Sequence, residues 1–413
     1  MGMLGICPFL PIGFILLRSF ISYFSYAFKW VIVPTLLGFD MTTIVADPVS
    51  YPFPSVFLYT FFRCVSAAWS VLLAVGAVTV LTFKKEYFYD FAAAVGFLTA
   101  LSQSTKVYDD NQASVFWLLV RGVPMWDFEP VKRAVGSVID RLMTGTARSG
   151  GAGQGLVDWE AEGLGMDWKQ GLVTILVMVW AVKFGAYTTI RTILRNGDSR
   201  FDEVRTDPKV FLALFMIQIV WIMACLGPVI ALNMVPPEAF PYISPVQWEL
   251  EYTVRMALFW FGLCVCVRGL CIETIADYQI SKWRIARAFK KHKEVFCSWG
   301  LWSGCRHPNY YGECLFWLGL SIACLAVLIS EVARSMLGLT WLGAVLLCVA
   351  SPMFTFYLIR DLSIPVVEKK YDALYMHRKD YRRWRRTDTL RLWLDRDQEK
   401  PVECSGEPEE ADE

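Results

Sequence analysis

Blocks of about 20 consecutive apolar residues recur along the chain and limit what it can fold into. A run of this length spans the hydrocarbon core of a bilayer as an α-helix, in which every backbone polar group is satisfied internally. Hydrophobic residues make up 55% of the chain, above the roughly 45–50% of soluble domains. The pattern predicts an all-α, polytopic transmembrane helical bundle of about seven spans. The blocks lie near 9–38, 55–83, 88–106, 171–190, 209–234, 253–275, 311–330 and 336–359.

The loops between these blocks differ in charge and predict an orientation. Residues 191–209 and 276–310 are rich in arginine and lysine, and residues 377–386 read HRKDYRRWRR, whereas residues 235–252 hold neither cation. Because basic loops stay on the cytosolic side of a membrane, we expect the basic segments and the C-terminus in the cytosol. The formal net charge of +1 favours no particular partner, and the sequence suggests neither nucleic acid nor an obligate protein partner.

Two stretches are polar and predict no span. Residues 121–170 form a glycine-rich insert whose SGGAGQG sequence fits no phosphate-binding motif, so we expect a flexible loop. Residues 391–413 form an acidic tail that we expect to be disordered.

The N-terminus lacks the basic region of a secretory signal, so we expect the first apolar block to be a retained anchor.

The cysteines predict packing rather than metal binding. The 12 cysteines are scattered, many of them inside apolar blocks, no C-x-x-C occurs, and the chain has three histidines. Free cysteine is a small residue that is often buried. No metal site is predicted.

One candidate site lies in GLWSGCRHPNYYGECLFWLGL, residues 300–320. Pro308 suits the first position of a helix. From there Asn309, Glu313 and Trp317 recur at i, i+4 and i+8, so they share one helix face. A carboxylate inside a membrane span is costly and is a functional candidate by default.

The residues that flank this helix start allow a second interpretation. Arg306 and His307 precede the helix N-terminus, which attracts anions. An interfacial belt of aromatic residues and cations would equally explain Arg306, Tyr310 and Tyr311, but it would not explain Glu313.

Two further polar clusters each have a structural alternative. In residues 273–287, Glu273 and Asp277 precede Lys282, Arg284 and Arg287, a pattern that suits a ligand with both hydroxyl groups and phosphates, or an amphipathic surface helix.

In residues 357–386, Arg360 ends the last span and Glu368 follows a proline. This second cluster also fits a positive-inside anchor. The charged stretch 195–208 by itself favours a solvated loop.

Residues 300–320 resemble the R-H-P-N-Y-x-G-E signature of the steroid 5α-reductase-like membrane enzymes, most closely their little-characterised steroid-reductase-related branch. The resemblance covers about 85–390, which we take as the steroid-reductase-like domain, and leaves 1–84 as N-terminal membrane anchor helices. Four more motifs are similar and in the same order: YDFAAAVGFLTAL (89–101), RNGDSRFDEVRTDP (195–208), IADYQISKW (275–283) and IPVVEKKY (364–371).

This resemblance implies a fold and an activity. The fold would be an all-helical membrane bundle with a cytosol-facing NADPH pocket near its C-terminal helices, without a Rossmann domain. The activity would be that of an NADPH-dependent oxidoreductase acting on CH–CH groups, like a 3-oxo-5-alpha-steroid 4-dehydrogenase. The substrate would be a steroid-like or isoprenoid lipid enone, and the location the endoplasmic reticulum.

The resemblance also implies residue roles. Asp277 matches a cofactor-contacting aspartate, and Asn309 and Glu313 match nicotinamide-side and ribose-side contacts. Ile280 and Ser281 separate Lys282 from Gln279, which departs from the family pattern. For the catalytic acid, Tyr87, Tyr89 and Asp90 at a span boundary are the candidates. The full set of implied cofactor contacts is Asp277, Lys282, Arg287, Arg306, His307, Asn309, Tyr310, Glu313, Trp317, Arg360 and Glu368.

Two other functions stay open at this point. Isoprenylcysteine carboxyl methyltransferases share R-H-P-x-Y-x-G and a trailing glutamate, and they use S-adenosylmethionine. A lipid-binding membrane protein without catalysis is the other alternative. Asn309 and the IADYQ segment favour the reductase.

Overall fold

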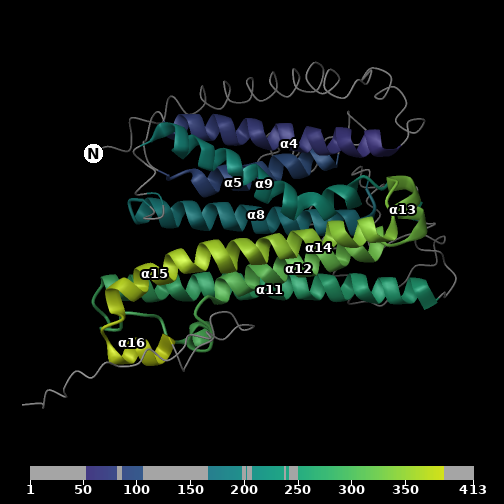
Figure 1. Ribbon diagram of the computed structural model, residues 1–413. Helices are drawn as coiled ribbons and strands as arrows, with labels where there is room; N and C mark the ends of the chain where they lie inside the picture. The colour runs from purple at the N-terminus through teal and green to yellow at the C-terminus, as the bar shows by residue number, and fades with distance from the viewer. Residues whose placement is uncertain are drawn as a thin grey trace, which may run out of the picture. The chain divides into compact units, whose positions relative to one another are not determined.

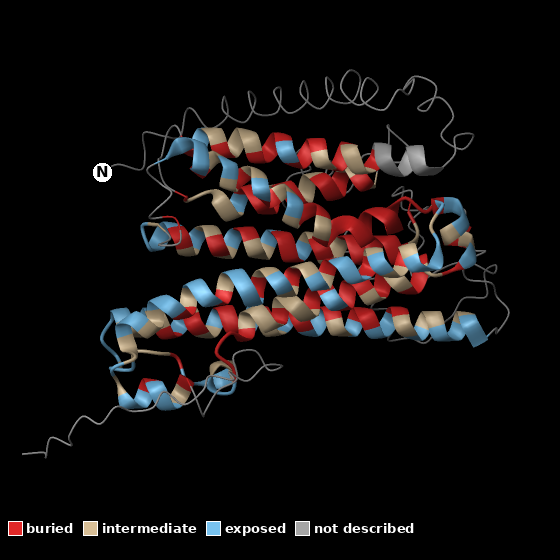
Figure 2. Cartoon of the chain, viewed as in Figure 1, coloured by how far each residue is buried: buried red, intermediate tan, exposed pale blue. Residues whose placement is uncertain are grey.

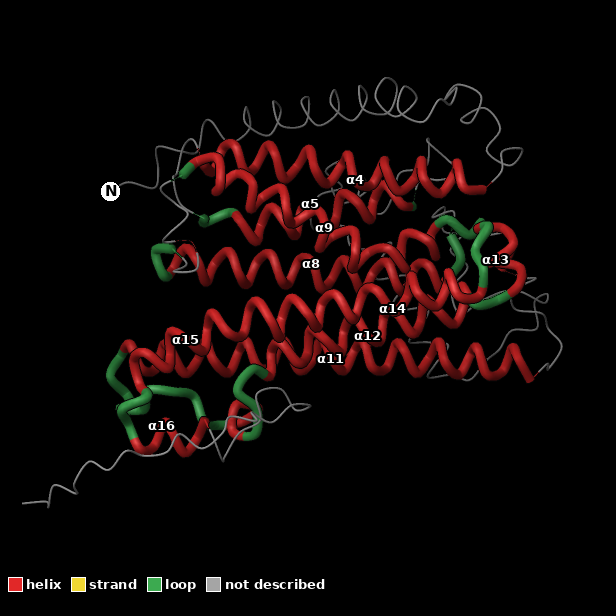
Figure 3. Tube along the Cα trace, viewed as in Figure 1, coloured by secondary structure: helices red, strands yellow, loops and turns green. Residues whose placement is uncertain are grey.

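The computed structural model is helical, with no strand among the residues it describes (Figure 3). Six helices in this part of the chain are long and apolar enough to cross a bilayer. The prediction of an all-α, polytopic membrane protein is therefore confirmed. The structure describes residues 53–80, 86–105, 166–197, 201, 207–236, 239–240 and 250–385.

Each of the six spans corresponds to one of the apolar blocks, and Figure 1 shows the helices that form them. The last span continues from α14 through a π-helical segment into α15. The helices that form the spans are α4 (Phe53–Val78), α8 (Trp168–Leu194), α9 (Pro208–Asn233), α11 (Leu250–Ala288), α12 (Pro308–Leu328), α14 (Trp341–Tyr357), the segment Leu358–Ser363 and α15 (Ile364–Tyr375).

Two of the predicted apolar blocks do not correspond to any of the six spans. Block 88–106 forms α5 (Tyr89–Ser104), whose 16 residues extend about 24 Å, less than the roughly 30 Å of a hydrocarbon core. Block 9–38 lies outside the described residues, as do most of the predicted N-terminal anchors and the acidic tail 391–413.

Helix α8 begins inside the predicted insert 121–170, most of which lies outside the described residues. Asp167 and Gln170 form a capping box. The Asp167 carboxylate accepts a hydrogen bond from the Lys169 N–H at 2.9 Å, and Gln170 Oε1 accepts one from the Asp167 N–H at 2.9 Å. These bonds satisfy two backbone groups that a helix start otherwise leaves unpaired.

The described residues divide into two compact units. The first, residues 1–267 and 317–356, has an aromatic core. Trp180 and Trp317 are fully buried, with ring centroids 4.9 Å apart. The Phe97 ring lies 5.2 Å from Trp180 and stacks on Trp317 at 5.6 Å. Edge-to-face and offset contacts of this kind stabilise aromatic clusters beyond the area that they bury.

Within the first unit, α11 and α12 are in backbone contact at two glycines. A Cβ added to Gly319 would lie 2.2 Å from the Cys266 backbone nitrogen, and one added to Gly262 would lie 2.5 Å from that of Ala323. Small residues allow membrane helices to approach this closely, and the van der Waals contact then holds them together.

The second unit, residues 268–316 and 357–413, repeats the contact. A Cβ on Gly269 would lie 2.4 Å from the Phe316 nitrogen, and one on Gly312 would lie 2.5 Å from the Glu273 nitrogen. Both helices thus place glycines seven residues apart, close to two helical turns, so that the glycines of each helix fall on one face.

Exposed residues recur along α11 (Figure 2), and several of them are large and apolar. Val254 is 56% exposed, Phe261 58% and Ile275 48%. An exposed apolar stripe on a span of this length fits contact with lipid tails.

Replacing Gly319 with alanine should lower the free energy of unfolding by about 1–3 kcal/mol, because the added methyl group overlaps the Cys266 backbone and forces the helices apart. The thermal unfolding midpoint of the purified protein in detergent measures this change. Gly343→Ala is the matched control, since a Cβ there meets only side chains, the nearest being Thr340 Oγ1 at 3.2 Å. Equal midpoints for the two variants would contradict the backbone contact.

Candidate functional site

The segment before α12 is fastened to α11 by two side chains. Gln279 Oε1 accepts a hydrogen bond from the Leu301 N–H at 3.0 Å, and the Trp302 indole N–H donates to the Ala276 carbonyl at 3.1 Å. Gly300 has a φ of +64°, and a Cβ there would lie 2.5 Å from the Gln279 amide. Glycine adopts this left-handed conformation without strain. These contacts fix the residues that lead into α12.

Trp302 also packs on a small apolar cluster formed by Ile280, Trp283 and Cys297. Burial raises the pKa of the Cys297 thiol to about 11. The thiol therefore stays protonated at neutral pH, and it serves packing rather than nucleophilic chemistry.

The antiparallel register of α11 and α12 determines which polar residues meet. The Glu273 backbone lies against Gly312, so one further turn along each helix brings Asp277 level with Pro308. Glu273 and Asp277 are each 5% exposed. Two buried acidic residues of α11 therefore lie on the turns of that helix that are level with the first turns of α12.

Asn309 carries a buried acceptor with no hydrogen-bond partner in the described part of the chain. Its side-chain Oδ1 is closed off from solvent, while the residue as a whole is half-buried. A buried polar atom that makes no hydrogen bond costs about 1–3 kcal/mol. Glu313 follows one turn later on the same helix face, as the sequence predicted. The arrangement suits a ligand that supplies a donor to Oδ1.

Two guanidinium groups and one imidazole surround one carboxylate in front of this helix. Glu368 Oε1 lies 2.9 Å from Arg306 Nε and 3.1 Å from His307 Nε2, and its Oε2 lies 3.6 Å from an Arg385 guanidinium nitrogen. Arg306, His307 and Arg385 are 3%, 7% and 6% exposed. A charge buried this deeply needs a partner of opposite sign, so the four residues depend on one another.

A second carboxylate extends this network. The Arg385 guanidinium donates to both Asp372 oxygens, at 2.7 and 2.8 Å, and the Tyr381 hydroxyl donates to the same carboxylate at 2.9 Å. Burial, helped by the bond to Asp372, raises the pKa of Tyr381. Arg306 also donates to the Arg385 carbonyl. The network ties the start of α12 to the C-terminal segment.

The structure thus brings together three of the predicted cofactor contacts, Arg306, His307 and Glu368, with Tyr310 stacked on the His307 ring at 5.6 Å. Arg385 was missed as a site residue. Its only signal in the sequence is the dense cationic run HRKDYRRWRR, which does not indicate which cation faces a carboxylate.

The other predicted cations have different surroundings. Arg287 donates to the Val295 carbonyl at 2.9 Å and to the Tyr375 hydroxyl at 3.4 Å. Lys282 and Arg360 are exposed.

Trp317 lies in the aromatic core of the first unit, against Phe97 and Trp180. It shares a helix face with Asn309 and Glu313, as the sequence predicted, but protein aromatics cover its ring.

The catalytic candidates also belong to the first unit. The Tyr87 hydroxyl donates to Asn196 Oδ1 at 2.6 Å. The Tyr89 hydroxyl donates to the Leu214 carbonyl at 3.3 Å. Asp90 is partly exposed in the first turn of α5. Their catalytic role stays a prediction.

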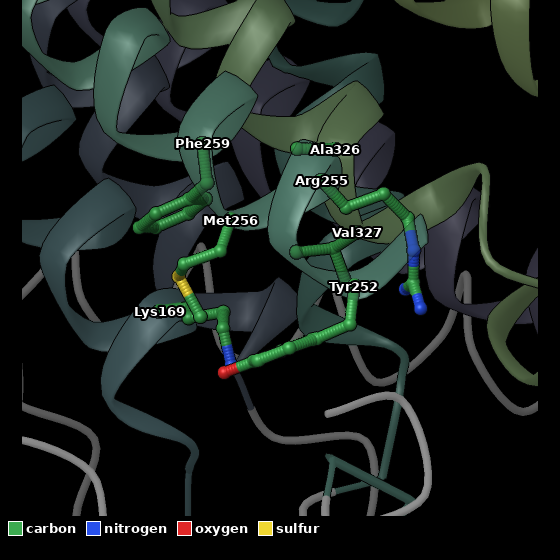
Figure 4. Close-up of a pocket in the computed structure, with 7 residues that line it drawn as sticks. All are labelled: Lys169, Tyr252, Arg255, Met256, Phe259, Ala326 and Val327. Atoms are coloured by element: carbon green, nitrogen blue, oxygen red, sulfur yellow. The ribbon is translucent and has the colours of Figure 1, made fainter. Parts of the chain in front are cut away.

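The first unit also contains a small hollow that the sequence did not predict (Figure 4). Its Lys169 is 5% exposed, lies 3.8 Å from the Asp167 carboxylate and stands over the Trp168 ring at 4.7 Å. These neighbours satisfy the buried ammonium group. The hollow has a volume of about 220 Å³, open mouth included, and is lined by Lys169, Tyr252, Arg255, Met256, Phe259, Ala326 and Val327.

Comparison with known proteins identifies a family that this chain matches. Residues 159–388, more than half of the chain, match a family described as "Protein of unknown function (DUF1295)". This family is associated with steroid 5-alpha-reductase-like proteins. The comparisons found no match among curated proteins and none among solved structures. The matched segment contains every predicted cofactor contact, whereas Tyr87, Tyr89 and Asp90 precede it.

Replacing Glu368 with glutamine should lower the free energy of unfolding by about 3–5 kcal/mol, because it leaves buried Arg306 without its counter-charge, whereas Arg385 keeps Asp372. The thermal unfolding midpoint in detergent measures the loss. The control is Asp380→Asn, which removes the exposed 2.8 Å ion pair with Arg378 and should leave the midpoint unchanged. If both variants melt like the parent, the network does not support the fold.

Proposed function

The chain belongs to the DUF1295 family, and we propose that it is an NADPH-dependent membrane ene-reductase. It would reduce a carbon–carbon double bond conjugated to a carbonyl in a steroid-like or isoprenoid-derived lipid. We place it in the endoplasmic reticulum membrane, with its basic loops in the cytosol. The five motifs shared with the steroid-reductase-related branch support this proposal. The structural observation that carries it is the unpartnered, buried Oδ1 of Asn309.

The residues at the start of α12 fit the nicotinamide end of the cofactor. A nicotinamide carboxamide carries an NH₂ donor, which is what Asn309 Oδ1 lacks. Glu313 adds a second acceptor one turn away. A donor on the ligand would thus replace the hydrogen bond that Asn309 Oδ1 loses when it leaves water.

Asp277 fits the ribose. The Asp277 carboxylate is 5% exposed. An ionisable group on a membrane-spanning helix is a candidate for function, and a ribose presents two hydroxyl donors that a carboxylate can accept. The position of Asp277, level with Pro308, places it beside the carboxamide partner Asn309.

The phosphates need cations that a ligand can reach. Arg306 and His307 share Glu368, so we assign them a positioning role: they hold the N-terminus of α12. Lys282 and Arg360 are exposed, and with Arg287 they are our candidates for the pyrophosphate and the 2′-phosphate, which guanidinium and ammonium groups bind strongly.

In this proposal the bound cofactor supplies a hydride to the β-carbon of the enone. The chain's own residues orient the cofactor and keep water out. Asn309, Glu313 and Asp277 hold its polar end, and the apolar helices accept the lipid. A side-chain acid must hydrogen-bond the substrate carbonyl and stabilise the developing negative charge, and a proton must reach the α-carbon.

Tyr87 and Tyr89 are our candidates for this acid. Each hydroxyl already donates to a protein acceptor, Asn196 Oδ1 or the Leu214 carbonyl. A substrate carbonyl would have to take the place of that acceptor. Tyr87→Phe and Tyr89→Phe test the assignment once turnover is measurable.

The thermal unfolding midpoint with NADPH, NADH or S-adenosylmethionine tests the function. A ligand at about 100 times its Kd stabilises a protein by roughly 2.7 kcal/mol, so we expect NADPH to raise the midpoint. A rise with S-adenosylmethionine alone would contradict the reductase and favour a carboxyl methyltransferase. A rise with none, in folded protein, would favour a lipid-binding protein without catalysis.

Asn309→Ala tests the observation that carries the proposal. It should weaken NADPH binding about tenfold, the value of one buried hydrogen bond. The ligand-free variant should be at least as stable as the parent, because an unsatisfied atom is removed. Ser321→Ala is the matched control, since Ser321 Oγ is also buried without a partner on α12, about 18 Å further along the helix. Equal NADPH affinities in both variants would refute the assignment.

A further inference from the structure

The second unit joins two basic segments that lie far apart in the sequence. The loop after α11 carries Lys290, Lys291 and Lys293. Helix α16 (Lys379–Arg383) contributes Lys379 and Arg382. All five side chains are exposed and have no partner in the part of the chain that the structure describes.

Aromatic side chains hold the two segments together. The Phe296 ring, from the loop, stacks on Trp384 with centroids 4.7 Å apart, and lies edge-on to Tyr381 at 5.7 Å. Tyr381 is itself fixed by its hydrogen bond to Asp372. The basic charges of both segments therefore belong to one surface, which we call the basic surface.

The charge of the basic surface is strongly one-sided. Residues 289–296 and 378–384 contain seven lysines and arginines but only two acidic residues, Glu294 and Asp380, a formal charge of +5. Asp380 is already bound to Arg378, at 2.8 Å. Glu294 is thus the one acid of these two segments outside an ion pair with their own cations.

The position of the basic surface, directly after a membrane-spanning helix, indicates what kind of partner it binds. The loop leaves α11 at Ala288. Ile285 in the last turn of that helix (59%) and Phe289 at the start of the loop (73%) are exposed beside the lysines. Trp299, 39% exposed, adds an indole, a residue enriched at membrane interfaces. Exposed apolar residues next to juxtamembrane cations are suited to the headgroup layer of a bilayer.

We propose that the basic surface binds anionic phospholipid headgroups of the adjacent leaflet. It would make the protein select phosphatidylserine or similar lipids over neutral ones. This inference is independent of the reductase proposal, since it uses none of the groups assigned to the cofactor.

Native mass spectrometry of the full-length protein, released from nanodiscs of mixed phosphatidylcholine and phosphatidylserine, tests the inference by counting the lipids that stay bound. We expect phosphatidylserine to be enriched. Neutralising the loop (K290Q/K291Q/K293Q) or the helix (K379Q/R382Q) should reduce this enrichment, about fivefold in affinity per cation. The charge-preserving K290R/K291R/K293R variant should retain it.

Phe296→Ala tests whether the two segments act together, because it keeps every charge but removes the stack. It should lower enrichment toward the level of either neutralised variant. Phe296→Leu replaces it if the alanine variant is unfolded by circular dichroism. Full enrichment in both neutralised variants would overturn the proposal. A loss in only one of them, with no effect at Phe296, would overturn the joint surface. Equal losses for K290Q/K291Q/K293Q and for Lys209→Gln, an exposed cation on α9, would also refute the proposal.

Discussion

The contact between the backbones of α11 and α12 is the constraint on which the rest of the candidate site depends. Four glycines, two on each helix, leave no room for even a methyl group. Within a membrane no hydrophobic effect drives helices together, so close backbone packing has to supply the attraction. This packing fixes the register. Because Gly312 lies against Glu273, the acidic turns of α11 meet the first turns of α12 and not another part of that helix.

Two kinds of polar group lie at the start of α12: one has its partners within the protein, and the other lacks a hydrogen-bond partner. Arg306, His307 and Glu368 satisfy one another and are nearly inaccessible, so they provide rigidity. Asn309, the next residue but one after His307, keeps an acceptor with no partner among the described residues. A rigid surround with one unsatisfied atom is the arrangement expected of a preorganised binding site, because little conformational freedom is left to lose when a ligand arrives.

The local features of this protein could be predicted from its sequence. The apolar blocks predicted the spans, Pro308 predicted the start of α12, and helical spacing predicted that Asn309 and Glu313 share one face. Contacts between segments that lie far apart in the sequence could not be predicted. Glu368 lies 62 residues from Arg306. The IPVVEKKY motif contains Glu368, but nothing in the sequence indicates that it pairs with Arg306 or selects Arg385 from a run of cations. The seven-residue spacing of the glycines is visible in each helix, but one sequence does not tell which helices they join.

Because the glycines fix how α11 packs on α12, the number of residues between Gly269 and Asp277 determines where the Asp277 side chain lies. Each residue turns an α-helix by about 100°. A single insertion in α11 between Gly269 and Asp277 would leave every side chain present, yet it would rotate Asp277 from α12 toward the lipid. Homologous proteins that bind the same ligand should therefore vary in their loops and tails while keeping this eight-residue interval constant, even where the residues within it have changed.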